Sequence, residues 1–394
     1  MNPEFIKPRY DEGGFVGIPN RIKAAFTSGK YDAVVLFLID GFGWRFFERF
    51  QDAPFIKRFV KNGQVEKLIS QFPSTTAAHL TAIHTGWNVG QSGVYEWIYY
   101  EPQVDALISP LLFSYAGSRY RNDLASTGIH PPLFYPRGLF YPELSKMGVN
   151  SYIFGSRDYS PSTYSEVVMA GAEIYPFKSF SEALINTGLL LEGQTQPAYV
   201  HVYFDGIDSL SHEYGPTARQ TEAEIETFLL MMEYYFERVF NGKKKVLFLM
   251  TADHGQSEVD PDTTLYLNIE PRFAGIERFL KTNRKGKLLV PAGSARDMFL
   301  YIKNDLLEET QLFLTPRLEG KADVVQTEFL IEQGYFGDEV SSRFRERVGN
   351  VVILPYRNES VWWYEKGKFE QHFYGHHGGL TPQEMETVLY SIEV

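Results

Sequence analysis

The chain has 394 residues, of which 44% are hydrophobic and 15% aromatic, so it is long and apolar enough to bury a large core. Lys and Arg number 38 against 49 Asp and Glu, which gives a net charge of -11. A chain of this sign gains nothing from releasing the counterions of nucleic acid, so neither a duplex nor an anionic membrane surface is an expected partner. An enzyme of this charge that acts on phosphates needs a local positive source, and bound divalent metal is the usual one.

The chain contains no cysteine, which excludes disulfides, thiolate metal sites and a cysteine nucleophile. The opening residues MNPEFIKPRYDEGG lack the apolar core of a signal peptide, and no apolar stretch is long enough to cross a bilayer. We therefore expect a cytoplasmic protein. The absence of cysteine agrees with this location without establishing it, because exported bacterial proteins can also lack cysteine. The sequence does not indicate an oligomeric state.

Five apolar runs predict the strands of a sheet. In chain order they are DAVVLFLI before Asp40, QVEKLIS before Gln71, SYIFG from Ser151, AYVHVYF before Asp205 and KVLFLMT before Ala252. Near-continuous apolar runs are typical of parallel strands that are covered on both faces. Segments such as PFIKRFVKNG and ARQTEAEIETFLLMMEYYFERVF predict helices between them. This alternation indicates a doubly wound α/β layer fold.

Two segments lack the alternation. Residues 95–137 are rich in Tyr, Pro and Phe, and residues 256–371 separate two stretches that carry motifs. We interpret the second segment as an inserted, smaller cap, which leaves residues 1–255 and 372–394 as the metal-binding core. The sequence of the cap gives no indication of the substrate.

Polar residues follow the predicted strands directly, at the edge where open α/β sheets bind their ligands. Asp40 lies in LIDGFG after the first strand, and Asp253 and His254 lie in MTADHGQSE after another. In FDGIDSLSHEYGP, Asp208 precedes His212 by four residues, so both side chains face one ion if the segment is helical. Each motif alone is more often a turn or a chance pair than a site.

Two further clusters carry a hydroxyl group and histidines. In FPSTTAAHLTAIHTG, Ser74, Thr75 and Thr76 begin a predicted helix. A hydroxyl there is usually a cap, but a helix N-terminus beside a metal also favours an alkoxide that attacks phosphorus. In FYGHHGGLTPQEM, His376 and His377 precede two glycines, and histidines in a glycine loop seldom serve packing. Five such clusters at strand ends are not expected to arise independently, so we interpret them as parts of one metal site. Their oxygen and nitrogen donors suit zinc first, with manganese as an alternative.

The order DGFG, PSTTAAHLTAIHTG, DSLSHEYGP, ADHG and HHGGLTPQEM resembles the alkaline phosphatase superfamily, specifically its type I phosphodiesterase and nucleotide pyrophosphatase branch. The resemblance runs from about residue 32 to the C-terminus, and DSLSHEYGP is its most specific part. It implies an α/β/α sandwich with a mainly parallel sheet, two divalent metals and a threonine nucleophile. The resemblance implies four ligands for one metal, namely Asp40, Thr76, Asp253 and His254. It implies three ligands for the other metal, namely Asp208, His212 and His377.

The chain departs from the family pattern in two places. Nucleotide pyrophosphatases carry an Asn after a HisGly motif that binds a phosphoryl oxygen, whereas SGVYEW places Trp97 there. We expect Trp97 to line the substrate pocket and a backbone amide near Ala77 to serve the phosphoryl oxygen. The histidine before the two glycines is also doubled, so His376 is either an alternative ligand or a support for the ligands. Counting residues back from the ThrGly at Thr85, as in the family pattern, selects Thr76 over the adjacent Thr75 as the nucleophile.

The resemblance implies a hydrolase of a small phosphorylated substrate that reacts in two in-line steps through a phosphothreonine at Thr76. Phosphodiester or pyrophosphate hydrolysis is the main hypothesis. The alternatives on the same site are phosphomonoester hydrolysis, phosphonate cleavage and phosphoryl mutation, and for a monoester dianion Arg157 is a candidate cation. A non-catalytic metal-binding protein is a minor alternative. A site that had lost its activity would be expected to lose ligands, whereas all seven ligand positions keep a competent residue type.

Overall fold

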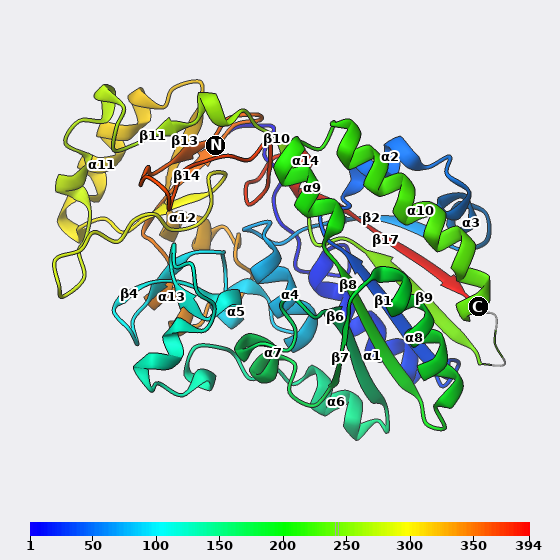
Figure 1. The fold of residues 1–394 in the computed structure, drawn as a ribbon. Coiled ribbons are helices and arrows are strands. Elements are labelled where there is room, and N and C mark those ends of the chain that lie inside the picture. The colour runs from blue at the N-terminus through cyan, green and yellow to red at the C-terminus, as the bar shows by residue number, and fades with distance from the viewer. Residues whose placement is uncertain (241, 243) are drawn as a thin grey trace.

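The computed structural model describes residues 1–240, 242 and 244–394, and its central feature is a seven-stranded sheet (Figure 1). The strand order is β2-β17-β9-β1-β8-β6-β7. The neighbours β9, β1, β8, β6 and β7 pair in parallel, whereas β17 is antiparallel to both β9 and β2. The strands are β1 (Ala33–Ile39), β2 (Gln64–Ile69), β6 (Asn150–Ser156), β7 (Glu173–Phe177), β8 (Ala198–Phe204), β9 (Val246–Thr251) and β17 (Glu386–Glu393).

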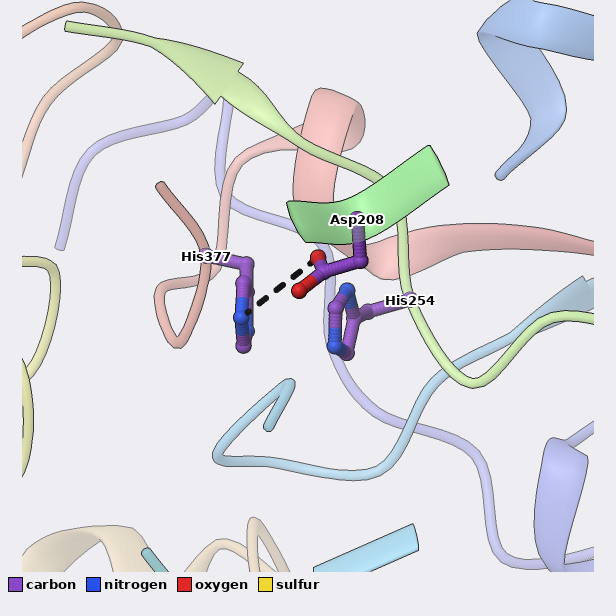
Figure 2. Close-up of side chains that lie close together, drawn as sticks. All are labelled: Asp208, His254 and His377. Atoms are coloured by element: carbon purple, nitrogen blue, oxygen red, sulfur yellow. Dashed lines mark ion pairs between the residues drawn. The ribbon is translucent and has the colours of Figure 1, made fainter. Parts of the chain in front are cut away.

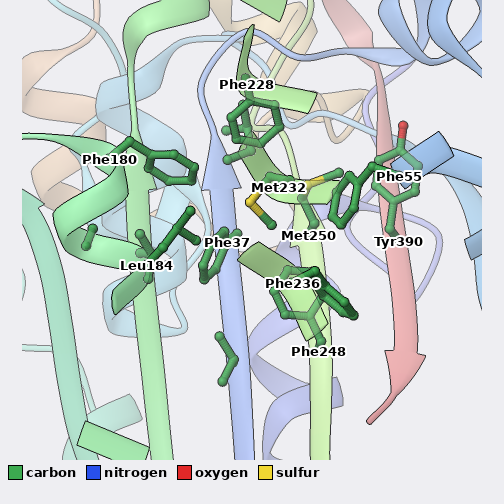
Figure 3. Packing of buried hydrophobic residues seen from close by; sticks show 14 of the residues in the cluster. Phe37, Phe55, Phe180, Leu184, Phe228, Met232, Phe236, Phe248, Met250 and Tyr390 are labelled. Atoms are coloured by element: carbon green, nitrogen blue, oxygen red, sulfur yellow. The ribbon is translucent and has the colours of Figure 1, made fainter. Parts of the chain in front are cut away.

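Helices cover both faces of this sheet. On β1, Val35 and Phe37 point into one apolar cluster with helices α3, α8 and α10, part of which is drawn in Figure 3. The alternate residues Val34 and Leu36 point into a second cluster with α1, α4 and α6. Because successive side chains of a strand point to opposite faces, an unbroken apolar run is required for a strand buried on both sides. The structure therefore confirms the predicted α/β/α layers and mainly parallel sheet.

The helices match the predicted segments where apolar periodicity was clear. PFIKRFVKNG contains α3, and ARQTEAEIETFLLMMEYYFERVF contains α10. No helix of the described residues is both long and apolar enough to span a membrane. The helices are α1 (Ile18–Thr27), α2 (Trp44–Phe50), α3 (Pro54–Asn62), α4 (Thr76–Thr85), α5 (Val89–Ser92), α6 (Phe140–Lys146), α7 (Thr163–Val168), α8 (Phe180–Gly193), α9 (Gly206–Tyr214), α10 (Arg219–Phe240), α11 (Leu307–Leu314), α12 (Thr327–Glu332), α13 (Ser342–Arg347) and α14 (Pro382–Met385).

A smaller lobe lies beside the sheet, on the left of Figure 1, and it draws on two stretches of the chain. One apolar cluster joins Tyr95, Tyr99 and Phe113 to Phe299 and Val352, so the Tyr-rich segment packs against the predicted cap. The boundaries 256–371 for the cap remain a prediction. The strands of this lobe are β3 (Tyr99–Glu101), β4 (Ala106–Ser109), β5 (Ser114–Tyr115), β11 (Leu265–Tyr266), β12 (Met298–Leu300), β13 (Ala322–Gln326), β14 (Val351–Pro355) and β15 (Val361–Trp362). The short antiparallel pair β10 (Ser257–Glu258) and β16 (Gly375–His376) packs against α9 of the core.

A buried ion pair connects the predicted cap to the end of the core. Arg296 precedes β12, and its Nη2 lies 2.9 Å from Oε2 of Glu384 on α14, with both side chains fully buried. Arg296 also donates to the carbonyls of Tyr356 and Glu359. The guanidinium thus has protein acceptors on three sides, as a buried charge requires.

We expect Arg296→Met to destabilise the protein by about 3–5 kcal/mol, because it leaves the Glu384 carboxylate buried without its partner. Arg278→Met is the matched control: its pair with Glu309 spans 2.8 Å but both side chains are more than half exposed, so it should cost no more than about 1 kcal/mol. Urea denaturation of both variants measures the difference. Equal losses would show that the buried pair does not hold the cap to the core.

Candidate active site

The carboxyl edge of the sheet brings the predicted ligand residues into one buried cluster. Asp40 follows β1, and Asp253 and His254 follow β9. Asp208 lies on α9, which follows β8 on the other side of β1. Because β8, β1 and β9 are adjacent parallel strands, their carboxyl ends meet at one edge of the sheet. The topology therefore explains why segments far apart in sequence converge here.

Two further segments complete the cluster. Thr76 is the first residue of α4, and His377 follows β16. Ser74 fixes these segments against each other: its hydroxyl donates to the carbonyl of Gly379 at 2.8 Å and accepts from the backbone N–H of Gly378 at 3.2 Å. The Ser74 hydroxyl is consumed by these bonds, so its role is to position the loop that carries His377.

Asp40, Asp253 and His254 form one group, with ligand atoms that all lie within 4.8 Å of one another. The Nε2 atom of His254 is 3.3 Å from Oδ1 of Asp40 and 3.4 Å from Oδ2 of Asp253. The Thr76 hydroxyl lies 3.2 Å from the same Nε2 and 3.4 Å from Oδ2 of Asp40. The structure thus gathers the four residues that the resemblance assigns to one ion.

Asp208, His212 and His377 form the second predicted set. Asp208 and His212 lie on one face of α9, with Oδ2 and Nε2 3.3 Å apart. The Nε2 atoms of His212 and His377 are 3.2 Å apart. Figure 2 shows the Asp208 carboxylate directed toward the rings of His377 and His254, which stack with centroids 3.6 Å apart. Because Asp208, His254 and His377 also lie within 4.8 Å of one another, His254 belongs to both groups.

Backbone carbonyls set the orientation of the three clustered imidazoles. The Nδ1 atoms of His212, His254 and His377 lie 2.8 Å, 3.1 Å and 2.9 Å from the carbonyl oxygens of Gly375, Gly255 and Ser74, respectively. A carbonyl accepts only, so each neutral ring carries its proton on Nδ1 and directs the lone pair of Nε2 into the cluster. This is the arrangement in which histidine binds a metal.

Two carboxyl groups of the cluster, those of Asp40 and Asp253, are buried without enough positive charge to balance them, whereas the neighbouring histidines lower the pKa of Asp208. Burial, and then the charges of Asp253 and Asp208, raise the pKa of Asp40 well above its usual value. Burial and the charge of Asp208 raise the pKa of Asp253 to about 7. Oδ1 of Asp40 and Oδ2 of Asp253 are buried and have no hydrogen-bond partner among the described residues. Carboxylate oxygens and imidazole nitrogens that converge in this way fit divalent cations.

Two residues that the sequence did not single out support the cluster. The Tyr203 hydroxyl, at the end of β8, donates to Oδ2 of Asp40. The Gln256 amide donates to Oδ1 of Asp208. Both residues hold a carboxylate in place through one oxygen and leave another oxygen toward the cluster. Gln256 comes two residues after the histidine of ADHG, which was the one signal in the sequence that could have revealed it.

The neighbouring candidates take other positions. Thr75 is the N-cap residue of α4 and is buried, and its carbonyl accepts from Nδ1 of His79 at 2.7 Å. His376 lies with its ring 5.4 Å from that of His212, and its Nδ1 is 3.0 Å from the carbonyl of His377. His376 is therefore next to the second set. Neither His376 nor His212 is in the two groups of converging ligand atoms, but Nε2 of His212 lies 3.3 Å from Oδ2 of Asp208 and 3.2 Å from Nε2 of His377.

Two pockets open from the cluster, and Thr76, Trp97 and Asp208 line both of them. The sheet-side pocket has a volume of about 260 Å³ and is lined mostly by apolar and aromatic residues of the core, such as Leu80 and Tyr164. The cap-side pocket has a volume of about 440 Å³ and is lined by Glu96, Trp362, Phe369, Glu370 and Phe373 with the histidines of the second set. Trp97, which we expected to line the substrate pocket, is 41% exposed and lines both pockets. Ala77, whose backbone amide we expected to bind a phosphoryl oxygen, is buried in the first turn of α4.

A family model described as type I phosphodiesterase / nucleotide pyrophosphatase matches residues 34–380. The chain belongs to this family. Membership makes it an enzyme, a phosphoryl hydrolase of the group that contains phosphodiesterases and nucleotide pyrophosphatases. The family is metal-dependent, and the two groups of converging ligand atoms are candidate sites for its metals. A search of the curated proteins found no match.

Solved structures share the fold of this family member. Murine ectonucleotide pyrophosphatase / phosphodiesterase 5 is 15% identical with a TM-score of 0.67, and the match covers 91% of this chain and 87% of that one. An inactive threonine-to-alanine variant of the murine protein was solved in complex with AMP. Phosphonoacetate hydrolase from Sinorhizobium meliloti 1021, in complex with phosphonoacetate, is 15% identical with a TM-score of 0.62, covering 92% of this chain and 90% of that one. At these identities the likeness concerns the fold.

We expect about two divalent ions per chain of this family member after reconstitution, because the ligand atoms form two overlapping groups. Asp253→Ala and His212→Ala should each lower the metal content toward one ion, from opposite ends of the cluster, and each should abolish activity. Elemental analysis of the purified proteins measures the content. His130→Ala, in a part of the chain outside the cluster, is the control and should retain both ions. A wild-type protein that binds no ion would contradict the assignment.

Proposed function

We propose that the chain is a phosphodiesterase that uses two divalent metals, most simply zinc, and Thr76 as its nucleophile. One ion is held by Asp40, Thr76, Asp253 and His254, and the other by Asp208, His212 and His377. Three observations support this assignment: the convergence of these side chains, the Nε2 lone pairs directed into the cluster, and the unpartnered carboxylate oxygens.

The observation that favours a diester is the pair of pockets that diverge from Thr76. A phosphodiester carries two substituents on phosphorus, and the sheet-side and cap-side pockets offer one compartment for each. A monoester has one substituent, and its dianion needs additional cations. Arg157 does not supply one, because its side chain is 46% exposed and directed toward Glu182 at 4.0 Å. Arg121 lines the sheet-side pocket, so hydrolysis of a monoester would require Arg121 to supply the additional positive charge.

The reaction of a diester follows from the position of the Thr76 hydroxyl. The hydroxyl gives up its proton as its oxygen attacks phosphorus, the bond to the leaving alkoxide breaks and that alkoxide takes up a proton, and Thr76 is left esterified to a phosphoryl group that keeps the other substituent. Water then attacks the same phosphorus from the vacated side, the Thr76 oxygen leaves, and a phosphomonoester is released. Divalent ions supply positive charge that favours the threonine alkoxide and stabilises the charge on the phosphoryl oxygens. His254 and Asp40 orient the hydroxyl before the attack.

Phosphonate cleavage is the second candidate, because the fold of phosphonoacetate hydrolase matches at a similar TM-score. A panel of phosphodiesters, dinucleotides, phosphomonoesters and phosphonates, tested with metal-loaded protein, separates the two. We expect the highest kcat/KM for a diester. A higher value for a phosphonate or monoester would replace the proposed reaction while leaving the metal site and nucleophile intact.

Thr76→Ala should lower kcat by roughly three orders of magnitude or more, because it removes the attacking oxygen. Its metal content should stay close to that of the wild type, because the Asp and His side chains of both proposed sets remain. Thr75→Ala is the matched neighbour and should cost far less activity. Steady-state kinetics and elemental analysis measure both quantities. A trapped phosphate that maps to Thr75 or Ser74, or a Thr76→Ala variant that keeps most of its activity, would show that the nucleophile is wrong.

A further inference from the structure

A third pocket, of about 460 Å³, lies where helix α2 of the core meets the loop that follows β14. Arg45 and Arg49 line it from α2, one helical turn apart, and Arg357 lines it from the loop. We call it the arginine pocket. Three guanidinium groups around one pocket contrast with the net charge of -11, because the molecule as a whole repels the anions that arginine binds.

Two of the three arginines keep hydrogen-bond donors for a ligand. Arg45 makes two ion pairs, so its charge is already balanced. Arg49 makes one, with Nη2 lying 2.9 Å from Oε1 of Glu222. Arg357 is exposed, and its side chain forms no ion pair or hydrogen bond within the part of the chain that the structure describes. A guanidinium carries five N–H donors in a fixed fork, so Arg49 and Arg357 can both donate to an anion in the pocket.

Hydrogen-bond acceptors line the same pocket. The Oε1 atoms of Gln256 and Gln383 are buried and have no partner among the described residues. Gln256 is 6% exposed, and its amide nitrogen is used by Asp208, which leaves the oxygen as the free end of the amide. Glu258 adds a carboxylate, which accepts from the Thr217 hydroxyl at 3.0 Å and keeps further acceptor capacity. A ligand that supplies a donor to these oxygens is therefore favoured.

We propose that the arginine pocket binds a phosphate group that carries a proton, as the free ion or on a small substituent. Arg49 and Arg357 donate to its anionic oxygens through charge-assisted hydrogen bonds, and its P–O–H group donates to Glu258 or to a glutamine oxygen. An anion without a proton is rejected, because its oxygens and the Glu258 carboxylate are all acceptors. The site is separate from the proposed phosphodiesterase reaction and requires no metal.

Phosphate and sulfate test the proposal as a pair, because both are tetrahedral anions but only phosphate keeps an O–H near neutral pH. Each ion is titrated into the metal-loaded protein in a calorimeter. We expect a phosphate site, in addition to any at the metals, with an affinity at least about tenfold higher than for sulfate. Methylphosphonate also keeps one O–H and carries a methyl group. Tighter binding of methylphosphonate than of phosphate assigns the pocket to a substituted phosphate, and weaker binding assigns it to the free ion.

Four variants locate the site. Arg357→Gln and Arg49→Gln should each weaken it at least about tenfold, while phosphate binding at the metals stays unchanged. Arg278→Gln is the matched control for Arg49→Gln, because Arg278 also makes one exposed ion pair, with Glu309 at 2.8 Å, and it should have no effect. Glu258→Gln should narrow the preference for phosphate over sulfate, because a neutral amide can donate to an anion that has no proton.

The outcome separates this proposal from the proposed function. A phosphate site that both arginine variants weaken supports the arginine pocket even if no diester is hydrolysed, in which case the proposed function alone fails. Phosphate binding that neither arginine variant weakens, or sulfate binding as tight as phosphate binding in the wild type, overturns the pocket assignment and leaves the phosphodiesterase function standing. Thermal unfolding of each variant without phosphate verifies that the protein is folded.

Discussion

Three buried carboxyl groups at one sheet edge impose the strongest constraint on this molecule. Asp40, Asp208 and Asp253 approach one another at buried positions, and their mutual charge and burial raise the pKa values of Asp40 and Asp253. Such an arrangement is costly in a protein unless cations neutralise it. The surrounding structure is organised to keep it: glycine-rich turns bring the segments close, and backbone carbonyls turn the histidines inward.

The close approach of the segments explains the glycines of the motifs. A Cβ atom at Gly43 would lie 2.5 Å from Cα of Gly255, so the turns after β1 and β9 touch backbone to backbone. A Cβ atom at Gly378 would lie 2.5 Å from the Ser294 hydroxyl and 2.7 Å from Oδ1 of Asp297. Gly378 also has a φ of 126°, which side chains rarely adopt. The glycines of DGFG, ADHG and HHGG are thus required by packing around the cluster.

The sequence predicted the parts of the fold that follow from local patterns. The apolar runs of β1, β8 and β9 and the periodic apolar faces of α3 and α10 identify their elements directly, and the strand-end motifs predicted which side chains would meet. The antiparallel strand β17, which lies between β9 and the edge strand β2, was missed because its run ETVLYSIE mixes polar and apolar residues. Tyr203 and Gln256 were missed because their role depends on distances between segments, which no single motif contains.

The structure of the smaller lobe could not be predicted from local sequence patterns, for a physical reason. One of its apolar clusters joins residues near position 95 to residues near position 350, so the Tyr-rich stretch depends on the later stretch for its core. A second cluster lies almost wholly within residues 265–369, but it is assembled from many short elements whose periodicity is not clear in the sequence. The two pockets are likewise formed by residues that are far apart in the sequence. The sheet-side pocket is built by residues from several separate segments between Asp40 and Ser209, so the composition of either pocket becomes visible only when the segments are assembled.

If Trp97 stands where the family pattern has an Asn, as we expect from the sequence, the phosphoryl oxygens must be bound in another way. An indole N–H is a single donor on a rigid ring, and Trp97 is partly exposed and lines both pockets, a position from which we propose that it separates the substituents of the substrate. The nearest fixed donors are the backbone amides at the start of α4, since the first-turn N–H groups of a helix lack intrahelical acceptors. They lie beside the Thr76 hydroxyl, and the helix dipole favours negative charge there. We therefore expect the amide of Ala77 to take over the contact that the Asn side chain makes in the family, and the freed position to serve the choice of substrate.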